Sequence, residues 1–261
     1  MDYGITQSLQ GRVALVTGVS RQIGIGFAVA KRLALFGADL FIHSYAPFDA
    51  EQPYGGDLQG MPALLETLHN LGGRVEHRQA NFMEADAPQQ LIAAAVRAFG
   101  HLDILVANHA YSTSAVLEDL TADEIDRHLL VNVRATLLLI KGFADQHDGR
   151  PGGRIVLITS GQQGSPMPSE LSYIASKGAL YPLTLSLSAY LAERNITVNS
   201  INPGATDTGY ASPELYKIVL EQEPKGRWGM PEDAAKLIAF LCSDDAQWIT
   251  GQTINSTGGG P

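Results

Sequence analysis

Residues 12–37 read RVALVTGVSRQIGIGFAVAKRLALFG, and this stretch decides the fold. Its first six residues, Arg12 to Thr17, are mostly apolar and partly β-branched, which is typical of a short buried strand. A glycine-rich turn follows, and Phe27 to Phe36 then carries apolar residues at helical spacing until Gly37 ends the helix. A strand, a glycine turn and a helix in this order form the first half of a βαβ unit.

The glycines of this turn indicate a phosphate site. Gly18, Gly24 and Gly26 let the backbone approach a pyrophosphate, which would sit on amides at the positive end of the helix. A glycine loop of this kind also occurs as a plain tight turn. Residues further along the chain have to decide between these two interpretations.

Strands and helices alternate along the rest of the chain. We expect strands at 40–44, 74–80, 103–106, 154–159, 196–201 and 252–255, and helices at 61–71, 88–99, 121–140, from near 171 to about 194, and at 231–241. This alternation predicts an α/β fold: a doubly wound parallel sheet (Rossmann fold) in a three-layer α/β/α sandwich, with ligands at the carboxyl ends of the strands. We expect one dinucleotide-binding domain over 1–261, a surface excursion at 46–60 and a mobile substrate lid at 209–226.

One pair of side chains in the helix near 171–194 points to proton transfer. Tyr173 and Lys177 are four residues apart, so in a helix they lie on one face. An ammonium beside a phenol favours the phenolate, and we expect it to lower the tyrosine pKa toward working pH. Such a tyrosine can give a proton to a carbonyl oxygen or take one from an alcohol. Taken alone, the pair also fits an ordinary helix with a surface lysine.

Composition narrows the class of protein. The 261 residues include 27 acidic and 18 basic ones, a formal charge of −9 without a Lys/Arg cluster, which argues against nucleic acid or an anionic membrane as partner. A lone cysteine, Cys242, gives neither an internal disulfide nor a metal site, so we expect a reducing, cytoplasmic location. Residues 1–10 lack a signal pattern, and no apolar run reaches about 18 residues.

The choice of coenzyme depends on the end of the second strand. A dinucleotide fold that uses NAD usually has a carboxylate there for the ribose hydroxyls, but the sequence reads His43-Ser44-Tyr45. Arg21, in the glycine turn, can instead bind a 2′-phosphate as a fixed bidentate donor, which favours NADP(H) over NAD(H). Asp49 and Glu51 follow soon after and leave a fold-back to the ribose open.

Together these pieces resemble the classical short-chain dehydrogenases/reductases over nearly the full chain. The matching signatures are Thr17-Gly18 with Gly24-Ile25-Gly26, the DILV strand with Asn108, Asn132, Ser160, Tyr173 with Lys177, Pro203-Gly204 with Thr208, and the tail at 226–252. Ser160 precedes Tyr173 by 13 residues, the spacing expected in that family. Each signature is weak by itself, but seven in the right order are strong together.

Three departures from the family pattern stand out. The family turn TGxxxGIG is met here either with Gln22 in place of the middle glycine or with two extra residues, Gln22 and Ile23; we prefer the insertion, which keeps Gly24-Ile25-Gly26 in register with the helix. His109 is bulky where the family is tight, and it either lines the substrate pocket or packs under the sheet. Asn81 stands in place of an aspartate, and its amide oxygen can still face an adenine amino group.

The resemblance implies a role for each matching residue. The implied catalytic set is Tyr173 as proton donor, Ser160 on the substrate oxygen, Lys177 on the ribose and Asn132 on a relay water. The implied coenzyme contacts are Gly18, Ser20, Arg21, Gly24, Ile25, Gly26, Ser44, Asn81, Phe82, Asn108, Tyr173, Lys177, Pro203, Gly204, Thr206 and Thr208. No metal site is implied.

The resemblance also implies an activity and its alternatives. It favours an NADP(H)-dependent oxidoreductase acting on a small carbonyl or alcohol substrate, most like a 3-oxoacyl thioester reductase, although the charge of −9 argues mildly against an acidic carrier. A sugar, polyol or other small alcohol dehydrogenase stays open, as does a catalytically silent NADP(H) sensor. The four-residue Tyr/Lys spacing disfavours an enoyl reductase. Related enzymes imply a homo-oligomer, a tetramer or a dimer.

Overall fold

The structure is a computed structural model that describes residues 9–161, 164 and 166–260. Within that part of the chain, seven strands form one parallel sheet in the order β3-β2-β1-β4-β5-β6-β7. The strands are β1 (Val13–Val16), β2 (Asp39–Ser44), β3 (Val75–Gln79), β4 (Ile104–Ala107), β5 (Gly153–Ile158), β6 (Ile196–Asn202) and β7 (Thr253–Asn255). The predicted doubly wound sheet is thus confirmed. The prediction of no signal pattern at 1–10 falls mostly outside the described residues.

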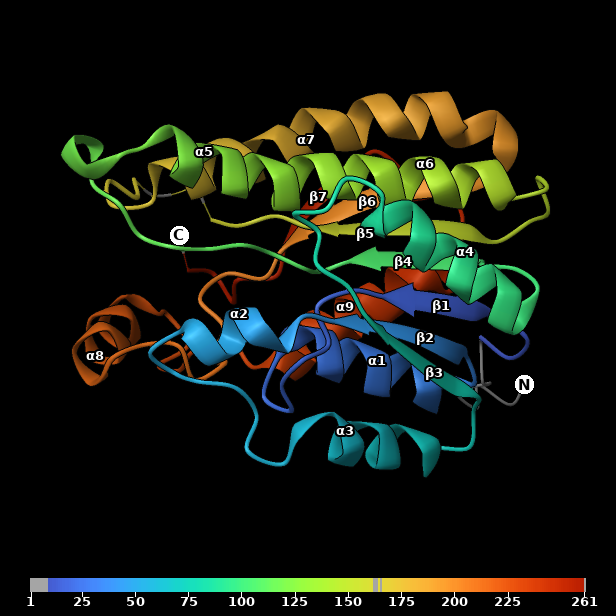
Figure 1. Cartoon of the computed structure of the whole chain (residues 1–261), viewed down its shortest axis with the longest axis horizontal. Coiled ribbons are helices and arrows are strands. Elements are labelled where there is room, and N and C mark those ends of the chain that lie inside the picture. The colour runs from blue at the N-terminus through green and yellow to red at the C-terminus, as the bar shows by residue number, and fades with distance from the viewer. Residues whose placement is uncertain (1–8, 162–163, 165, 261) are drawn as a thin grey trace.

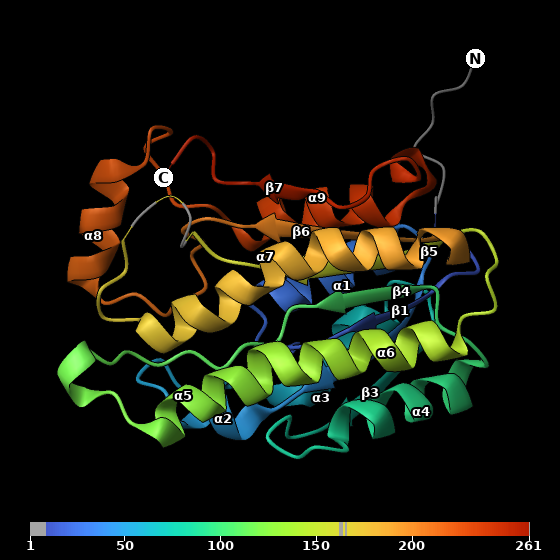
Figure 2. The same cartoon turned by 90° about the horizontal axis from the view of Figure 1, so that it is seen from above.

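Helices cover both faces of the sheet (Figures 1 and 2). One face carries α1 (Ile25–Leu35), α3 (Gly60–His69) and α9 (Pro231–Cys242); the other carries α4 (Ala87–Phe99), α5 (Ala122–His128), α6 (Thr136–Gln146) and α7 (Leu171–Leu191). Short 3₁₀ turns lie at η1 (Leu117–Asp119), η3 (Ala192–Arg194) and η4 (Asp244–Ala246). None of the helices in the described residues has the length and apolarity to cross a membrane.

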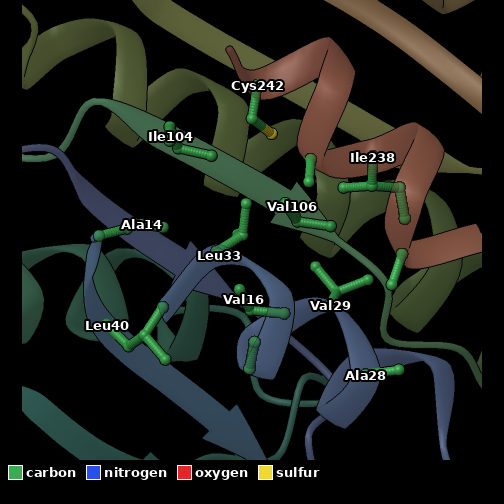
Figure 3. Packing of buried hydrophobic residues seen from close by; sticks show 14 of the residues in the cluster. Ala14, Val16, Ala28, Val29, Leu33, Leu40, Ile104, Val106, Ile238 and Cys242 are labelled. Carbon is green, nitrogen blue, oxygen red and sulfur yellow. The ribbon is translucent and has the colours of Figure 1, made fainter. Parts of the chain in front are cut away.

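The inner strands β1, β4, β5 and β6 are buried on both faces, and β1 and β4 are accordingly continuously apolar, whereas the outer strands β3 and β7 are partly exposed. In β1, Ala14 and Val16 pack with α1 and α9, as Figure 3 shows, whereas Val13 and Leu15 pack in the cluster beneath α4 and α6. The period of two residues thus splits one strand between two hydrophobic cores. This double burial holds the carboxyl ends of the strands in fixed positions.

The glycine turn between β1 and α1 is closed by a tight backbone contact. A Cβ at Gly26 would lie 2.3 Å from the carbonyl oxygen of Gly18 and 2.7 Å from Nδ2 of Asn108, so only glycine fits there. Gly18 itself has a φ of +72°, in the left-handed region that favours glycine. Gly26 therefore takes the place of the last glycine of the family turn, the one that allows the helix to pack closely. This agrees with the preferred alignment, in which Gln22 and Ile23 are inserted before it.

The predicted helix at 121–140 is wrong in one respect. The chain there forms α5, then η2 (Leu129–Ala135), a π-helical stretch, and only then α6, which runs on to Gln146. A π-helix adds one residue per turn and is often found at functional sites. Apolar spacing over 20 residues does not reveal such a local widening, since the pattern only shifts by one residue.

Two segments that we expected to be irregular contain helices. The excursion at 46–60 begins with α2 (Ala46–Glu51), and the expected lid at 209–226 contains α8 (Pro213–Gln222), capped by the Ser212 hydroxyl, which accepts from the Leu215 N–H at 3.2 Å. Trp228 anchors α8 through a 3.0 Å hydrogen bond from Nε1 to the Tyr216 carbonyl. Both helices lie at the end of the sheet toward which the strands run (Figures 1 and 2).

Candidate active site

Ser160, Tyr173 and Lys177 meet at the carboxyl end of β5. Ser160 follows that strand, and its hydroxyl lies near enough to Tyr173, at the start of α7, to lower the pKa of that phenol. Lys177 donates from Nζ to the carbonyl oxygen of Ile158 at 2.8 Å, and Nζ lies 6.0 Å from the centroid of the Tyr173 ring. The three side chains that the sequence singled out for proton transfer are therefore neighbours.

The expected effect of Lys177 on the tyrosine is wrong for the protein without coenzyme. Burial raises the pKa of Tyr173 to about 12, and the neighbouring Ser160 hydroxyl offsets this only in part. Burial also lowers the pKa of Lys177 to about 8, because a charged ammonium is costly away from water. Tyr173 is thus a protonated phenol at neutral pH, ready to give a proton.

Asn132 lies in the π-helical stretch η2, and its side-chain amide makes three hydrogen bonds within the protein. Its Oδ1 accepts from the Tyr111 N–H at 2.7 Å, while its Nδ2 donates to the Tyr111 carbonyl and to the Ser176 hydroxyl, both at 2.9 Å. Its own carbonyl accepts from the Thr136 hydroxyl at 2.8 Å. Asn132 thus joins the segment after β4 to α7 one residue before Lys177.

The turn after β1 fits the pyrophosphate of a dinucleotide. Asn108, at the end of β4, donates from Nδ2 to the carbonyl oxygens of Thr17 and Gly18 at 3.0 and 3.1 Å. These two hydrogen bonds fix the turn above the N-terminus of α1, with its open side facing outward. Gly24 immediately precedes Ile25, the first residue of that helix. Free N–H groups at a helix N-terminus suit an anionic group, and the close approach at Gly26 leaves no side chain in the way.

Arg21 is engaged with protein groups in this structure. Its Nε lies 3.4 Å from Oδ1 of the buried Asp49, its Nη1 donates to the Thr208 carbonyl at 2.9 Å, and the guanidinium covers the Tyr54 ring at 4.2 Å. Burial raises the pKa of Asp49, and the nearby Ser20 hydroxyl and Arg21 guanidinium lower it in part. Asp49, which the sequence left open as a ligand of the ribose, thus lies against Arg21, the predicted ligand of the 2′-phosphate.

The other predicted coenzyme contacts surround the ends of β2, β3 and β6. Ser44 hydrogen-bonds His77 at 2.8 Å, and Asn81 accepts from the Met83 N–H at 3.0 Å, so its amide oxygen already has one donor. The buried Phe82 stacks on His43, with 4.2 Å between the ring centroids. After β6, the loop Pro203, Gly204, Thr206 and Thr208 is closed by the Thr206 hydroxyl on the Pro203 carbonyl at 3.1 Å.

His109 packs beneath the turn instead of lining a substrate pocket. Its Nδ1 lies 2.8 Å from the Thr17 hydroxyl, its Nε2 lies 3.1 Å from the Val131 carbonyl, and Phe82 meets the ring edge-on. Of the two interpretations that the sequence left open, the packed histidine is the one observed. The sequence also gave no sign that Tyr111 and Ser176 would hold Asn132, because these residues are far apart along the chain.

Comparisons with known proteins agree with this geometry. A family model described as "Enoyl-(Acyl carrier protein) reductase" matches residues 18–260. An uncharacterized oxidoreductase of Bacillus subtilis (strain 168), YjdA, is 37% identical over 252 residues, 96% of this chain and 97% of the relative. Two solved structures, each 35% identical over 97% of this chain and 98% of the other, are a short chain dehydrogenase of Burkholderia cenocepacia J2315 in complex with NADP (TM-score 0.87) and the promiscuous reductase LugOII, which catalyses a keto-reduction in lugdunomycin biosynthesis (TM-score 0.84).

The match covers the strands, the glycine turn and the helices that carry the predicted site. It extends over far more than half of the chain, and the identity to full-length relatives exceeds a third. The chain therefore belongs to the short-chain dehydrogenase/reductase family, and it is a nicotinamide-dependent oxidoreductase that acts on CH–OH or C=O groups.

Proposed function

We propose that the protein is an NADP(H)-dependent carbonyl reductase with Asn132, Ser160, Tyr173 and Lys177 as its catalytic set. The observation that supports this proposal is that Ser160 and Tyr173 are neighbours at the carboxyl end of β5, with the Lys177 ammonium 6.0 Å from the centroid of the tyrosine ring. A phenol, a hydroxyl and an amine within one pocket can protonate a carbonyl oxygen and stabilise the charge that develops on it.

Each residue of the proposed catalytic set has its own role in the reduction. When bound, the nicotinamide coenzyme supplies or accepts the hydride. Tyr173, which is protonated at neutral pH, donates its proton to the carbonyl oxygen. The Ser160 hydroxyl donates to the same oxygen and fixes its position. The Lys177 cation stabilises the phenolate that Tyr173 becomes, and Asn132 holds the relay water that returns the proton.

NADP(H) is the proposed coenzyme, with Arg21 as the ligand of its 2′-phosphate. The end of β2 offers no carboxylate, and a structural relative was solved in complex with NADP. Arg21 now donates toward Asp49, so a 2′-phosphate would take the place of that carboxylate at the guanidinium. Arginine suits this exchange because its planar donors match either oxyanion.

A 3-oxoacyl thioester is the first substrate to test. The keto-reduction by the relative LugOII supports a ketone, whereas the family model's description favours an enoyl thioester. Sugars, polyols and other small alcohols remain the second class, and Tyr210, Tyr216 and Trp228 would give their pocket a partly apolar wall. A catalytically silent NADP(H) sensor is the alternative outside enzymes.

The test is the loss of NADPH absorbance at 340 nm with a panel of a 3-oxoacyl thioester, its enoyl counterpart, simple ketones and aldoses. We expect turnover with a carbonyl substrate and a kcat/KM for NADPH at least about tenfold above that for NADH, the value of one charge-assisted hydrogen bond. Turnover of only the enoyl compound would reassign the reaction. Tight NADPH binding without turnover of any compound would identify a sensor.

We also propose that residues 1–261 act as one domain, with 209–226 as the substrate lid, in a cytoplasmic homo-oligomer. Exposed apolar side chains support the oligomer: Tyr181 and Leu185 on α7 are exposed, and Trp248 before β7 is 95% exposed. Such residues are common at interfaces between copies of a chain. Light scattering on the purified protein distinguishes a monomer from a dimer or a tetramer.

A further inference from the structure

His109 connects the coenzyme turn to the π-helical stretch that carries Asn132. Its ring lies between β1 and η2, only 6% exposed, with one nitrogen toward each element. Nε2 lies 3.1 Å from the Val131 carbonyl, the residue before Asn132, and Nδ1 lies 2.8 Å from the Thr17 hydroxyl, the residue before Gly18.

The hydrogen bonds assign the tautomer of this ring. A carbonyl oxygen only accepts, so Nε2 carries the proton and donates to Val131. Nδ1 is then the acceptor of a hydrogen bond from the Thr17 hydroxyl at 2.8 Å, a shorter contact than the 3.3 Å from that hydroxyl to the Val106 carbonyl, while the Thr17 oxygen accepts from the N–H groups of Asn108 and His109. Burial holds the pKa of His109 well below its ordinary value, so this neutral form persists at physiological pH.

The same short segment is joined to η2 a second time, two residues later. The backbone of Tyr111 exchanges two hydrogen bonds with the Asn132 side chain, at 2.7 and 2.9 Å. The His109 side chain thus bonds the backbone of Val131, and the backbone of Tyr111 bonds the side chain of the next residue, Asn132. A π-helical stretch is uncommon, so contacts from outside the helix are needed to specify it.

We infer that His109 is a positioning residue: by donating to the Val131 carbonyl it fixes the wide helical turn that presents Asn132 to Ser176 and the neighbouring Lys177. This inference rests on the proposed function for the role of Asn132, and it gives the two nitrogens of His109 separate effects. Nε2 serves the catalytic turn, and Nδ1 serves the glycine turn where the coenzyme binds.

Two substitutions separate these effects. His109→Asn keeps an acceptor near the position of Nδ1 but has no donor for Val131. His109→Gln keeps a donor near the position of Nε2 but loses the acceptor for Thr17. For His109→Asn we expect kcat to fall about a hundredfold, as for a catalytic group displaced by about 1 Å, with a larger solvent deuterium isotope effect and an NADPH Kd within about twofold of the parent.

For His109→Gln we expect the opposite split: kcat within about threefold of the parent and an NADPH Kd raised about tenfold, the effect of one lost buried hydrogen bond. If the ring merely fills space, both variants would lose stability, and neither would show a loss of kcat separated from a loss of NADPH binding. Equal losses in the two variants, or a parental kcat in His109→Asn, would overturn the inference.

Hydrogen exchange gives a readout that does not depend on activity. Peptides covering 129–136 should exchange at least about tenfold faster in His109→Asn and near the parental rate in His109→Gln, because only the former releases the Val131 carbonyl. If the parent protein turns over no substrate, the proposed function fails, and this exchange pattern still decides the role of His109. Unchanged exchange in His109→Asn would refute that role.

Discussion

Lys177 follows Tyr173 by one helical turn, yet its ammonium bonds the backbone of β5 and lies 6.0 Å from the centroid of the tyrosine ring. We expect the cation at this distance to stabilise a phenolate once it forms. Before that, burial dominates both, which raises the pKa of Tyr173 to about 12 and lowers that of Lys177 to about 8. The pair is therefore set for proton donation.

The pH profile of reduction should follow Lys177. Its charge is present below its pKa of about 8 and is lost above it, so kcat/KM for carbonyl reduction should be constant at lower pH and fall above about pH 8. Tyr173 stays protonated throughout this range. Lys177→Arg keeps the cation at every pH, so its lower activity should lack the falling limb. A falling limb that persists in Lys177→Arg would assign it to another group.

Tyr173→Phe should lower kcat by about a thousandfold, the usual contribution of a positioned general acid, while the NADPH Kd stays within about twofold. The substitution removes one hydroxyl and leaves the ring packing intact. Steady-state rates and NADPH fluorescence titration measure the two effects. Tyr190→Phe is the matched control, because this exposed tyrosine lies on the same helix and its loss of a hydroxyl should change neither value. Substantial turnover by Tyr173→Phe would exclude the proposed mechanism.

Gly26→Ala should disrupt the coenzyme turn. Its new methyl group would lie 2.3 Å from the Gly18 carbonyl oxygen, so α1 must move away from β1. We expect a loss of about 1–3 kcal/mol in the free energy of unfolding, as for an overpacked core, and a raised NADPH Kd. Gly56→Ala, where no atom lies within 4 Å of the added Cβ, is the control. Denaturant unfolding and fluorescence titration measure both variants; equal behaviour would contradict the close contact.

Substitutions at Arg21 and at Asp49 should change the coenzyme preference in opposite directions. Arg21→Ala removes the proposed phosphate ligand and should raise the KM for NADPH about tenfold or more, with little effect on NADH. Asp49→Asn removes the carboxylate that competes for Arg21 and should lower the KM for NADPH. If Asp49 instead binds the ribose hydroxyls, Asp49→Asn will weaken NADH binding. Comparing kcat/KM for the two coenzymes separates these results.

Cys242 should resist thiol reagents in the folded protein. Burial within α9 raises its pKa to about 12 and leaves 2% of the residue exposed, whereas reaction requires an accessible thiolate. We expect no modification by iodoacetamide over hours in native buffer and rapid modification in denaturant, followed by mass spectrometry. Native-state labelling at the rate of a free thiol would contradict the packing of α9.

The sequence predicts the middle of the sheet because its inner strands are buried on both faces, so residues such as Ala14 and Leu15 are apolar whichever side they face. It could also have predicted α8, since Ser212-Pro213-Glu214 is a recognisable helix start. The widened turn at Leu129–Ala135 leaves no such mark. It depends on contacts from His109 and Tyr111, which only the folded chain brings together.

The site divides in the same way. Tyr173 and Lys177 could be paired from their spacing, because both lie on one helix. The partners of Arg21 could not, since Asp49, Tyr54 and Thr208 come from three separate segments. The pKa of Tyr173 could not be predicted either, because it depends on burial that spacing does not reveal.

Gln22 and Ile23, which we interpret as an insertion in the glycine turn, have a consequence for protein engineering. The Gln22 N–H donates to Asp57 at 2.7 Å, its side chain donates to Gln59 at 2.9 Å, and Ile23 lies against Gly209 at the approach to α8. In a chimaera that carries only this loop in the fold of a relative, the Gln22 amide would lose its hydrogen-bond partners and Ile23 would lose its packing partner. The loop, the excursion from α2 to α3 and the entrance to α8 are a single exchangeable cassette.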